Sequence, residues 1–295
     1  MPPTTDSGIT SYYVTQTDAN GCESDRASIS VRVKQKPASP GTAPVEFCSD
    51  KVTPLTATFA AGTSPNWYGT NPAGTPTSTA PTPSTAVIGR AVPYYVSQTL
   101  DGCESAQAFI DVTIKVLPAA PTVSSTPVTY CQDATASPLS ATGVTNGSLS
   151  WYTTQVGGNP LSTAPTPPTT SILPPTTYYY VSQTVNGCEG PRASIAVTIN
   201  PKPAKPTVVA SFTYCQNTTA ASLSATASGT LIWYADAAGS TVIPTPTPVT
   251  TTPGPTTYYV SQIDGKGCES DRATITVTIT ATPVAPRTAP ISVCQ

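Results

Sequence analysis

Apolar and polar residues alternate in four similar segments, which begin at Tyr12, Tyr94, Tyr179 and Tyr258. Each resembles the copy YYVSQIDGKGCESDRATITVTI, in which a Gly-containing turn and a cysteine separate two apolar runs. Period-two alternation is typical of a strand with one buried face, and Asn-Gly or Asp-Gly turns favour hairpins. The pattern therefore predicts four antiparallel β-hairpins. The inward residues expected in the second strands are Ala27, Ile29, Val31, Val33; Ala108, Ile110, Val112, Ile114; Ala193, Ile195, Val197, Ile199; and Ala273, Ile275, Val277, Ile279.

The hairpins recur at a period of about 80 residues, which indicates a tandem array. The 34 prolines fall between the strand patterns, and no amphipathic helical stretch of useful length is present. We expect an all-β protein of tandem immunoglobulin-like β-sandwich domains in an extended array. We name the units repeat 1 (1–36, the C-terminal part of a repeat), repeat 2 (37–117), repeat 3 (118–201) and repeat 4 (202–281), with 282–295 the start of a further repeat. The partial units lead us to expect a segment of a longer protein.

Each whole repeat carries one tryptophan between apolar residues, which predicts a core tryptophan at Trp67, Trp151 and Trp233. A segment rich in Thr and Pro follows, as in TPTSTAPTPST from Thr75. This composition favours an edge strand protected from pairing with other chains, and it is also typical of O-glycosylated stalks. The two interpretations are compatible. The candidate O-glycosylation sites are Thr75, Thr77, Thr79, Thr163, Thr166, Thr245 and Thr247.

Eight cysteines form two alternating classes. Cys48, Cys131, Cys215 and Cys294 lie near the start of a unit, whereas Cys22, Cys103, Cys188 and Cys268 follow the hairpin turns. Their strict alternation indicates disulfides and an oxidising compartment. Pairing within a unit competes with pairing across each linker, but the second would require the chain to fold back along a strand of about 40 Å to meet the ~6 Å disulfide spacing. We therefore predict the pairs Cys48–Cys103, Cys131–Cys188 and Cys215–Cys268, with Cys22 and Cys294 unpaired.

Only 9% of the 295 residues are charged, and the formal net charge is -2. This composition offers no basic surface for nucleic acid, and no apolar stretch is long enough to span a membrane. The absence of histidine removes the usual general base of an enzyme, and also a common metal ligand. The Asp-containing turns alone supply too few oxygens for calcium. We expect no enzyme activity, no cofactor and no metal.

Two motifs recur in the units: (Y)CQ ahead of a Leu-x-Ala-Thr strand, and YYVSQT…GCES near the end. They resemble the Ig-like repeats of very large surface proteins of Bacteroidetes, and the resemblance covers essentially the whole chain. It implies an extracellular or cell-surface protein, outer-membrane anchored or secreted, of the kind found among gliding and surface adhesins exported by the type IX system. The copy around Cys103 departs from the pattern, with Ala106 and Gln107 where the others have Asp-Arg or Pro-Arg. The resemblance implies no catalytic residues.

Two functional hypotheses remain. In the first, the repeats are structural and form a stalk or filament, with neighbouring repeats and other copies of the chain as partners. In the second, the chain is a multivalent adhesin that binds extracellular polysaccharide or other cells through repeated surfaces. A cluster of exposed aromatic residues repeated in every unit would favour the second. Phe109, on a strand face expected to be exposed, has no counterpart in the other copies.

Overall fold

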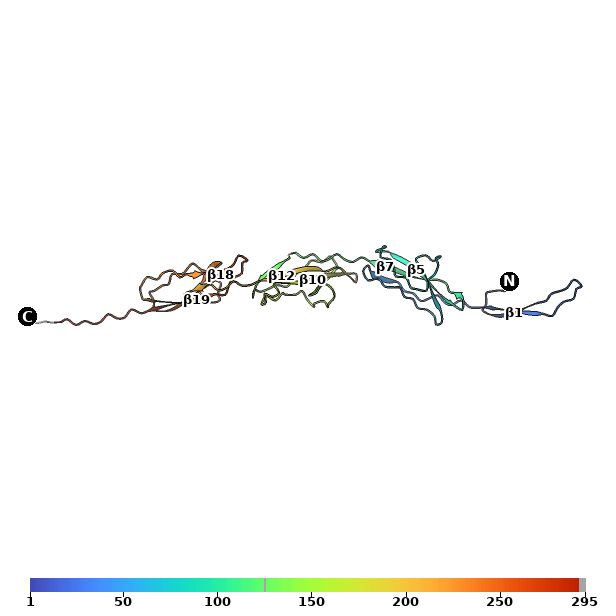
Figure 1. Ribbon diagram of the computed structural model, residues 1–295, viewed down its shortest axis with the longest axis horizontal. Helices are drawn as coiled ribbons and strands as arrows, with labels where there is room; N and C mark the ends of the chain where they lie inside the picture. Colours follow the sequence, from blue (N-terminus) through green and yellow to red (C-terminus); the bar gives the residue numbers. More distant parts are fainter. Residues whose placement is uncertain (125, 292–295) are drawn as a thin grey trace, which may run out of the picture. The chain divides into compact units, whose positions relative to one another are not determined.

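The computed structural model describes residues 1–124 and 126–291, and all regular secondary structure in these residues is β-strand (Figure 1). Within the described residues, no helix is long and apolar enough to cross a membrane. The chain divides into two compact units. The first comprises Met1–Ala119, Thr145–Ser148 and Gln183–Pro191, and the second comprises Ala120–Val144, Leu149–Ser182 and the described residues from Arg192 onward. The all-β prediction is confirmed.

Repeats 1 and 2 lie in the first unit. Their strands are β1 (Gly8–Val14), β2 (Ala27–Val33), β3 (Val45–Cys48), β4 (Ser64–Gly69), β5 (Ala91–Leu100), β6 (Cys103–Glu104) and β7 (Ala108–Lys115). In repeat 2 the main sheet has the order β3-β7-β5-β4, and β6 also pairs with β5. The β5–β7 pair is the predicted antiparallel hairpin, whereas β3 runs parallel to β7. Because β3 and β7 run in the same direction, both end at the same edge of the sandwich.

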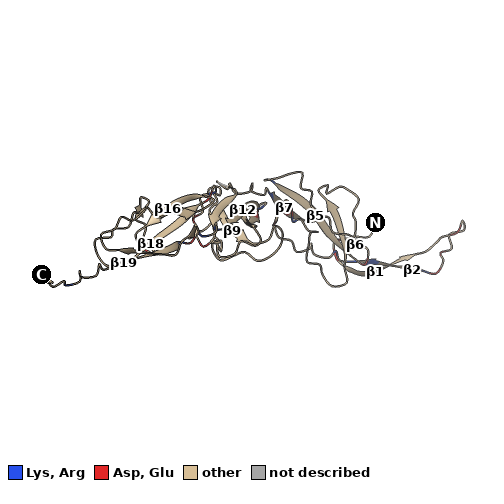
Figure 2. Cartoon of the chain, turned by 60° about the vertical axis from the view of Figure 1, so that its left-hand side comes forward, with Lys and Arg blue, Asp and Glu red and all other residues tan. Residues whose placement is uncertain are grey.

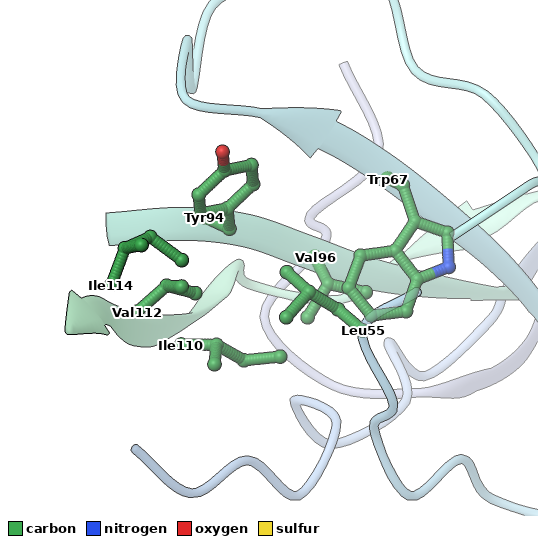
Figure 3. Close-up of a cluster of buried hydrophobic side chains, with 7 residues drawn as sticks. All are labelled: Leu55, Trp67, Tyr94, Val96, Ile110, Val112 and Ile114. Carbon is green, nitrogen blue, oxygen red and sulfur yellow. The ribbon is translucent and has the colours of Figure 1, made fainter. Parts of the chain in front are cut away.

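The inward faces of this sheet form the core of repeat 2. Figure 3 shows its seven buried side chains: Leu55, Trp67, Tyr94, Val96, Ile110, Val112 and Ile114. The alternation along β7 correctly predicts Ile110, Val112 and Ile114 inside, and Phe109 is 56% exposed on the outer face. Equivalent clusters surround Trp151 in repeat 3 and Trp233 in repeat 4. All three tryptophans are core residues, as their sequence positions predict.

The layer facing the main sheet is mostly irregular and includes the Thr/Pro segment. In repeat 2, Gly41 and Thr58 form an isolated bridge, and the Leu55 amide donates to the Pro81 carbonyl at 3.0 Å. Pro83 is buried, whereas the threonines on either side of Pro81 and Pro83 point outward or lie at the surface. Prolines that pack inward give up few ladder hydrogen bonds, because they donate none. The segment therefore closes the sandwich while presenting hydroxyl groups to solvent.

Repeat 3 contributes β8 (Val128–Cys131), β9 (Ser148–Tyr152), β10 (Thr176–Val185), β11 (Cys188–Glu189) and β12 (Ala193–Asn200). Repeat 4 contributes β13 (Thr207–Val208), β14 (Ser211–Cys215), β15 (Ala225–Thr226), β16 (Thr230–Tyr234), β17 (Val242–Ile243), β18 (Gly254–Ile263) and β19 (Ala273–Thr280). Both repeat the arrangement of repeat 2, since β8 runs parallel to β12 and β14 runs parallel to β19. The cysteine-bearing first strand therefore has the same neighbour and direction in all three sandwiches.

Repeat 1 differs from the prediction of a buried strand face. Its β1–β2 hairpin forms in register, with Tyr12 opposite Ile29. However, Ile29 is 54% exposed and Ile9 is 69% exposed, because residues 1–36 supply one hairpin and no facing layer. The alternation in β2 predicts the strand correctly, but its burial depends on a second layer.

Candidate functional site

The most distinctive chemistry of the structure lies where consecutive repeats meet. Cys48, at the end of β3 in repeat 2, forms a disulfide with Cys188, the first residue of β11 in repeat 3. Cys131, at the end of β8 in repeat 3, forms a disulfide with Cys268, in the hairpin turn of repeat 4. The Cα atoms of the pairs are 5.6 Å and 5.5 Å apart. The first bond lies within the first compact unit and the second within the second.

The predicted intradomain pairs Cys48–Cys103, Cys131–Cys188 and Cys215–Cys268 are therefore wrong. The reason is the direction of β3. It places Cys48 opposite Lys115, the last residue of β7, whereas Cys103 lies ahead of the first residue of β7. The eight residues of β7 span about 26 Å at the usual rise, far more than the ~6 Å that a disulfide allows. Each first-class cysteine instead faces the hairpin turn of the following repeat.

Three described cysteines remain as thiols: Cys22, Cys103 and Cys215. Cys22 was expected to be unpaired, whereas Cys103 and Cys215 were expected to have partners. Cys22 and Cys215 are exposed. Cys294, also expected to be unpaired, lies outside the described residues.

A lysine accompanies each contact between consecutive repeats. Lys34 donates from Nζ to the Asp101 carbonyl oxygen at 2.6 Å, and Lys115 donates to the Asn186 carbonyl oxygen at 3.2 Å. Lys202 lies 3.1 Å from the Asp133 carboxylate and 3.4 Å from Asp271. Its hydrogen bond with Asp133 raises the pKa of the Lys202 ammonium. Charged side chains are few on this chain (Figure 2), so their recurrence at these places is a feature of the junction.

A buried glutamine fastens each linker to the hairpin that follows it. Gln98 donates from Nε2 to the Ala38 carbonyl oxygen at 2.7 Å, and Gln183 and Gln262 do the same for Ala119 and Ala204 at 2.6 Å. These glutamines are 1–3% exposed. They come from the YYVSQ motif, at an inward position two residues beyond a buried valine. A polar residue on an apolar strand face was the sequence signal for this role, but the sequence interpretation did not use it.

The glutamate beside each turn cysteine holds the hairpin against the tryptophan-bearing strand. The Glu104 carboxylate accepts hydrogen bonds from the hydroxyl groups of Ser97 and Tyr68. These bonds lower the pKa of Glu104, and the bond to Glu104 raises the pKa of Tyr68. In repeat 4, Glu269 accepts from Tyr234 at 2.8 Å and from Ser261 at 2.5 Å. The glutamates are thus structural residues that position the cysteine-bearing turn.

An arginine supports the turn after the tryptophan-bearing strand in repeats 3 and 4. The Arg272 guanidinium lies 3.4 Å from the centre of the Tyr234 ring and donates to the carbonyl oxygens of Asp236 and Gly239. Arg192 lies 3.2 Å from the centre of the Tyr152 ring. In repeat 2, Gln107 occupies the position and donates to the Pro72 carbonyl at 2.8 Å. The departure at Ala106-Gln107 therefore replaces a stacked cation with a single neutral hydrogen bond.

No group of three or more Cys, Asp or Glu residues within 1–124 and 126–291 is arranged to hold a metal ion. The seven candidate O-glycosylation sites, Thr75, Thr77, Thr79, Thr163, Thr166, Thr245 and Thr247, are all exposed. Phe109 pairs with Tyr95 across the sheet, with ring centres 6.5 Å apart, but the matching positions in repeats 3 and 4 hold Ser194 and Thr274. The exposed aromatic pair therefore occurs in repeat 2 and not in the other two sandwiches.

A family model described as "Ig-like domain CHU_C associated" matches residues 37–118, 118–201 and 203–281. No curated protein matches the chain. Among solved structures, the I-band fragment I67–I69 of titin is 11% identical, with a TM-score of 0.35, and the match covers 83% of this chain and 97% of that one. Sidekick-1 immunoglobulin domains 1–4 are 12% identical, with a TM-score of 0.24, and the match covers 92% and 90%. These scores carry no argument, so the assignment rests on the family match and the sheets.

Proposed function

Because this chain belongs to the family of CHU_C-associated Ig-like domains, we propose that it is a structural segment of an extracellular or cell-surface protein, in which cross-linked repeats resist tension as part of a stalk or filament. The observation that carries this proposal is the pair of disulfides Cys48–Cys188 and Cys131–Cys268. Each gives two consecutive repeats a second covalent connection in addition to the linker. Disulfides of this kind are typical of oxidising compartments.

The two cross-links interleave, because Cys131 lies between Cys48 and Cys188 in the sequence and Cys188 lies between Cys131 and Cys268. The shortest covalent path from Cys48 to Cys268 passes through both disulfides and the 57 residues from 131 to 188. The uncrosslinked path has 220 residues, from 48 to 268. Fully extended, these paths measure roughly 200 Å and 800 Å. The cross-links therefore limit how far tension can extend the chain, even after a sandwich unfolds.

Single-molecule stretching of the oxidised full chain tests this proposal. We expect the segment between Cys48 and Cys268 to stop extending near ~200 Å, and to approach ~800 Å after reduction. A Cys131→Ser variant leaves the path from 188 to 268, and its limit is about 290 Å. Extension of the oxidised chain to the reduced length would contradict the proposal. Full extension at negligible force in both states would do the same.

The exposed threonines support a further part of the proposal, in which the Thr/Pro segments carry O-glycans. In repeat 4, Thr247 is exposed between the buried Pro246 and Pro248. The prolines hold the segment against the core while the hydroxyl group stays accessible. Mass spectrometry of the protein from its native source should find hexose-containing peptides that include Thr166 or Thr247. Unmodified peptides throughout would remove this part without affecting the cross-linked repeats.

The adhesin hypothesis has less support from the geometry. Its expected feature, an exposed aromatic cluster in each repeat, is confined to Tyr95 and Phe109 in the three sandwiches. Multivalent binding requires equivalent sites, because its gain comes from repeated engagement by one chain. Glycan-array binding that persists in a Phe109→Ser variant would favour the adhesin hypothesis over the structural one.

A further inference from the structure

The exposed thiols of Cys22 and Cys215 belong to two local structures that each match one half of a completed junction. In the second compact unit, the completed junction joins Cys131 to Cys268. Cys215 is the counterpart of Cys131, and Cys22 is the counterpart of Cys268. The comparison is one of hydrogen bonds as well as sequence.

The turn at Cys22 reproduces the turn at Cys268. Asp18 accepts at Oδ1 from the amides of Asn20 and Cys22 at 2.8 Å and 2.9 Å. Asp264 accepts from the amides of Lys266 and Cys268, both at 2.9 Å. The backbone bonds also correspond: the Asp18 amide donates to the Cys22 carbonyl at 3.0 Å, as the Asp264 amide does to that of Cys268. The turn that carries Cys22 therefore has the form that already holds a disulfide in repeat 4.

The strand end at Cys215 likewise reproduces the strand end at Cys131. The amide after each cysteine, in Gln216 and Gln132, donates at 2.8 Å to the last strand of the same repeat. The next amides, in Asn217 and Asp133, each donate at 3.0 Å to a threonine carbonyl of the Thr/Pro segment. Both of these residues have positive φ values, 65° and 62°. Cys215 therefore has the backbone setting of a cysteine that is cross-linked in repeat 3.

We propose that the strand end at Cys215 is a docking surface for the Cys22 turn of a second copy of this chain, and that the contact is closed by a Cys215–Cys22 disulfide. The argument is continuity with the junction between repeats 3 and 4, whose two halves recur as exposed and unpaired surfaces. The contact joins two different surfaces, so it propagates head to tail instead of closing as a symmetric dimer. This inference deepens the proposed filament role by naming the surfaces and the partner.

The cross-link requires an oxidant, which we take to be a low-molecular-weight disulfide such as oxidised glutathione. The Cys215 thiolate attacks that disulfide and releases one glutathione thiol. The Cys22 thiolate then attacks the protein sulfur of the mixed disulfide and releases the second. The two protons of the protein thiols end on the two glutathione thiols, and the protein has lost two electrons to the oxidant.

One element of the completed junction is weaker in the proposed contact. Lys202, which lies between Asp133 and Asp271, corresponds to Thr282 in repeat 4. The acidic counterparts are Asn217 and, on the second copy, Asp25. A Thr282→Lys substitution would place an ammonium near Asp25 of the partner and should increase the cross-linked yield. That gain should fall in high salt, because the charges are exposed.

The test uses full-length chains with Cys103→Ser and Cys294→Ser, so that Cys22 and Cys215 are the unpaired thiols under study. One form also carries Cys22→Ser and another carries Cys215→Ser. In glutathione redox buffer, we expect a dimer on non-reducing gels when the two forms are mixed, and none from either alone. The form that retains both thiols should give a ladder of oligomers. Peptide mapping should find Cys22 linked to Cys215.

Other outcomes overturn the proposal. Dimers formed by either single-thiol form alone indicate random oxidation. Monomers in the mixture, with Cys48–Cys188 intact, remove the second-copy contact but leave the proposed function standing. Loss of Cys48–Cys188 in the same peptide map instead removes the proposed function. A bond that appears in a tandem fusion of two chains, but not between separate chains, identifies the occupant as a repeat of the same polypeptide and rejects the second copy.

Discussion

Cys131 and Cys268 are 137 residues apart in the sequence, but their Cα atoms are 5.5 Å apart across the contact between repeats 3 and 4. Closing so long a loop removes about 5 kcal/mol of conformational entropy from the unfolded chain in the chain-entropy model. The interleaved loops share residues, so the cost of losing one is below the sum of two independent closures.

A Cys131→Ser/Cys268→Ser double variant should therefore unfold at lower denaturant concentration than the oxidised chain, by about 3 to 5 kcal/mol in free energy. Removing both partners avoids leaving a single reactive thiol in the junction. The measurement is a denaturation curve under non-reducing conditions. Cys22→Ser in the monomeric chain is the matched control, since Cys22 is exposed and has no disulfide partner among the described residues. Equal stability of the double variant and the control would contradict the assigned bond.

Replacing Gln98 with Leu should destabilise repeat 2 by about 2 to 4 kcal/mol, because buried groups lose their partners. The Gln98 side chain donates to the Ala38 carbonyl and accepts from the Ala60 amide at 2.8 Å and the Thr63 hydroxyl at 2.7 Å. Hydrogen exchange should show faster exchange of the Ala60 amide than in the wild type. The exposed Gln155 provides the control substitution, Gln155→Leu. An unchanged Ala60 exchange rate would show that the glutamine does not fasten this loop.

Stability of repeat 2 should fall in acid through Glu104. Hydrogen bonds from Ser97 and Tyr68 hold the pKa of Glu104 below its usual value in the folded state. The folded state therefore binds this proton less readily than the unfolded state, so the stabilisation is present above the unfolded pKa and is lost as the pH falls through the folded one. Thermal melts between pH 3 and 7 should show a smaller slope for Glu104→Gln than for wild type. Asp50→Asn, at an exposed position, should retain the wild-type slope.

Arg272→Lys should destabilise repeat 4 by roughly 1 to 2 kcal/mol, although it keeps the charge. A lysine cannot reproduce the planar stacking on Tyr234 together with the two bonds to the Asp236 and Gly239 carbonyls, at 2.8 Å and 2.7 Å. The loss should appear as a lower unfolding midpoint. Gln107→Lys in repeat 2, where no arginine stacks, is the comparison. Equal effects at both positions would mean that the ring contact contributes little.

The sequence predicts the hairpins and their buried residues well, because these follow from local alternation. Ile110 and Val112 are each 1% exposed, at positions that a period of two identifies without knowledge of the rest of the fold. Trp67 could be placed in the core for the same reason. Repeat 1 shows the limit of this inference, since the pattern in β2 is correct but Ile29 remains exposed without a facing layer.

The disulfide partners could not be obtained in this way. Their assignment depends on the parallel pairing of β3 with β7, in which Val45 lies opposite Val112 across a large sequence separation. A four-residue strand such as β3 carries no local signal for the direction of its partner. The role of Gln98 was more accessible. A buried amide on the same strand face as Val96 must find hydrogen-bond partners, and the entering linker provides one.

Native-state reduction should separate the junction disulfides from the remaining thiols. Cys188 is 1% exposed and Cys268 is 0% exposed, so a reductant reaches these sulfur atoms fully only after the junction opens. An alkylating reagent should label the exposed Cys22 and Cys215 at once, whereas labelling of Cys188 and Cys268 in the presence of a mild reductant should follow the slow opening of the repeats. The time course is read by mass spectrometry of individual peptides. Adding a low concentration of denaturant should accelerate the slow class and leave the fast class unchanged, because only the slow class depends on unfolding. If all four cysteines are labelled at one rate, the turns that carry Cys188 and Cys268 are open to solvent in the native protein, and the junction cannot hold consecutive repeats together under tension.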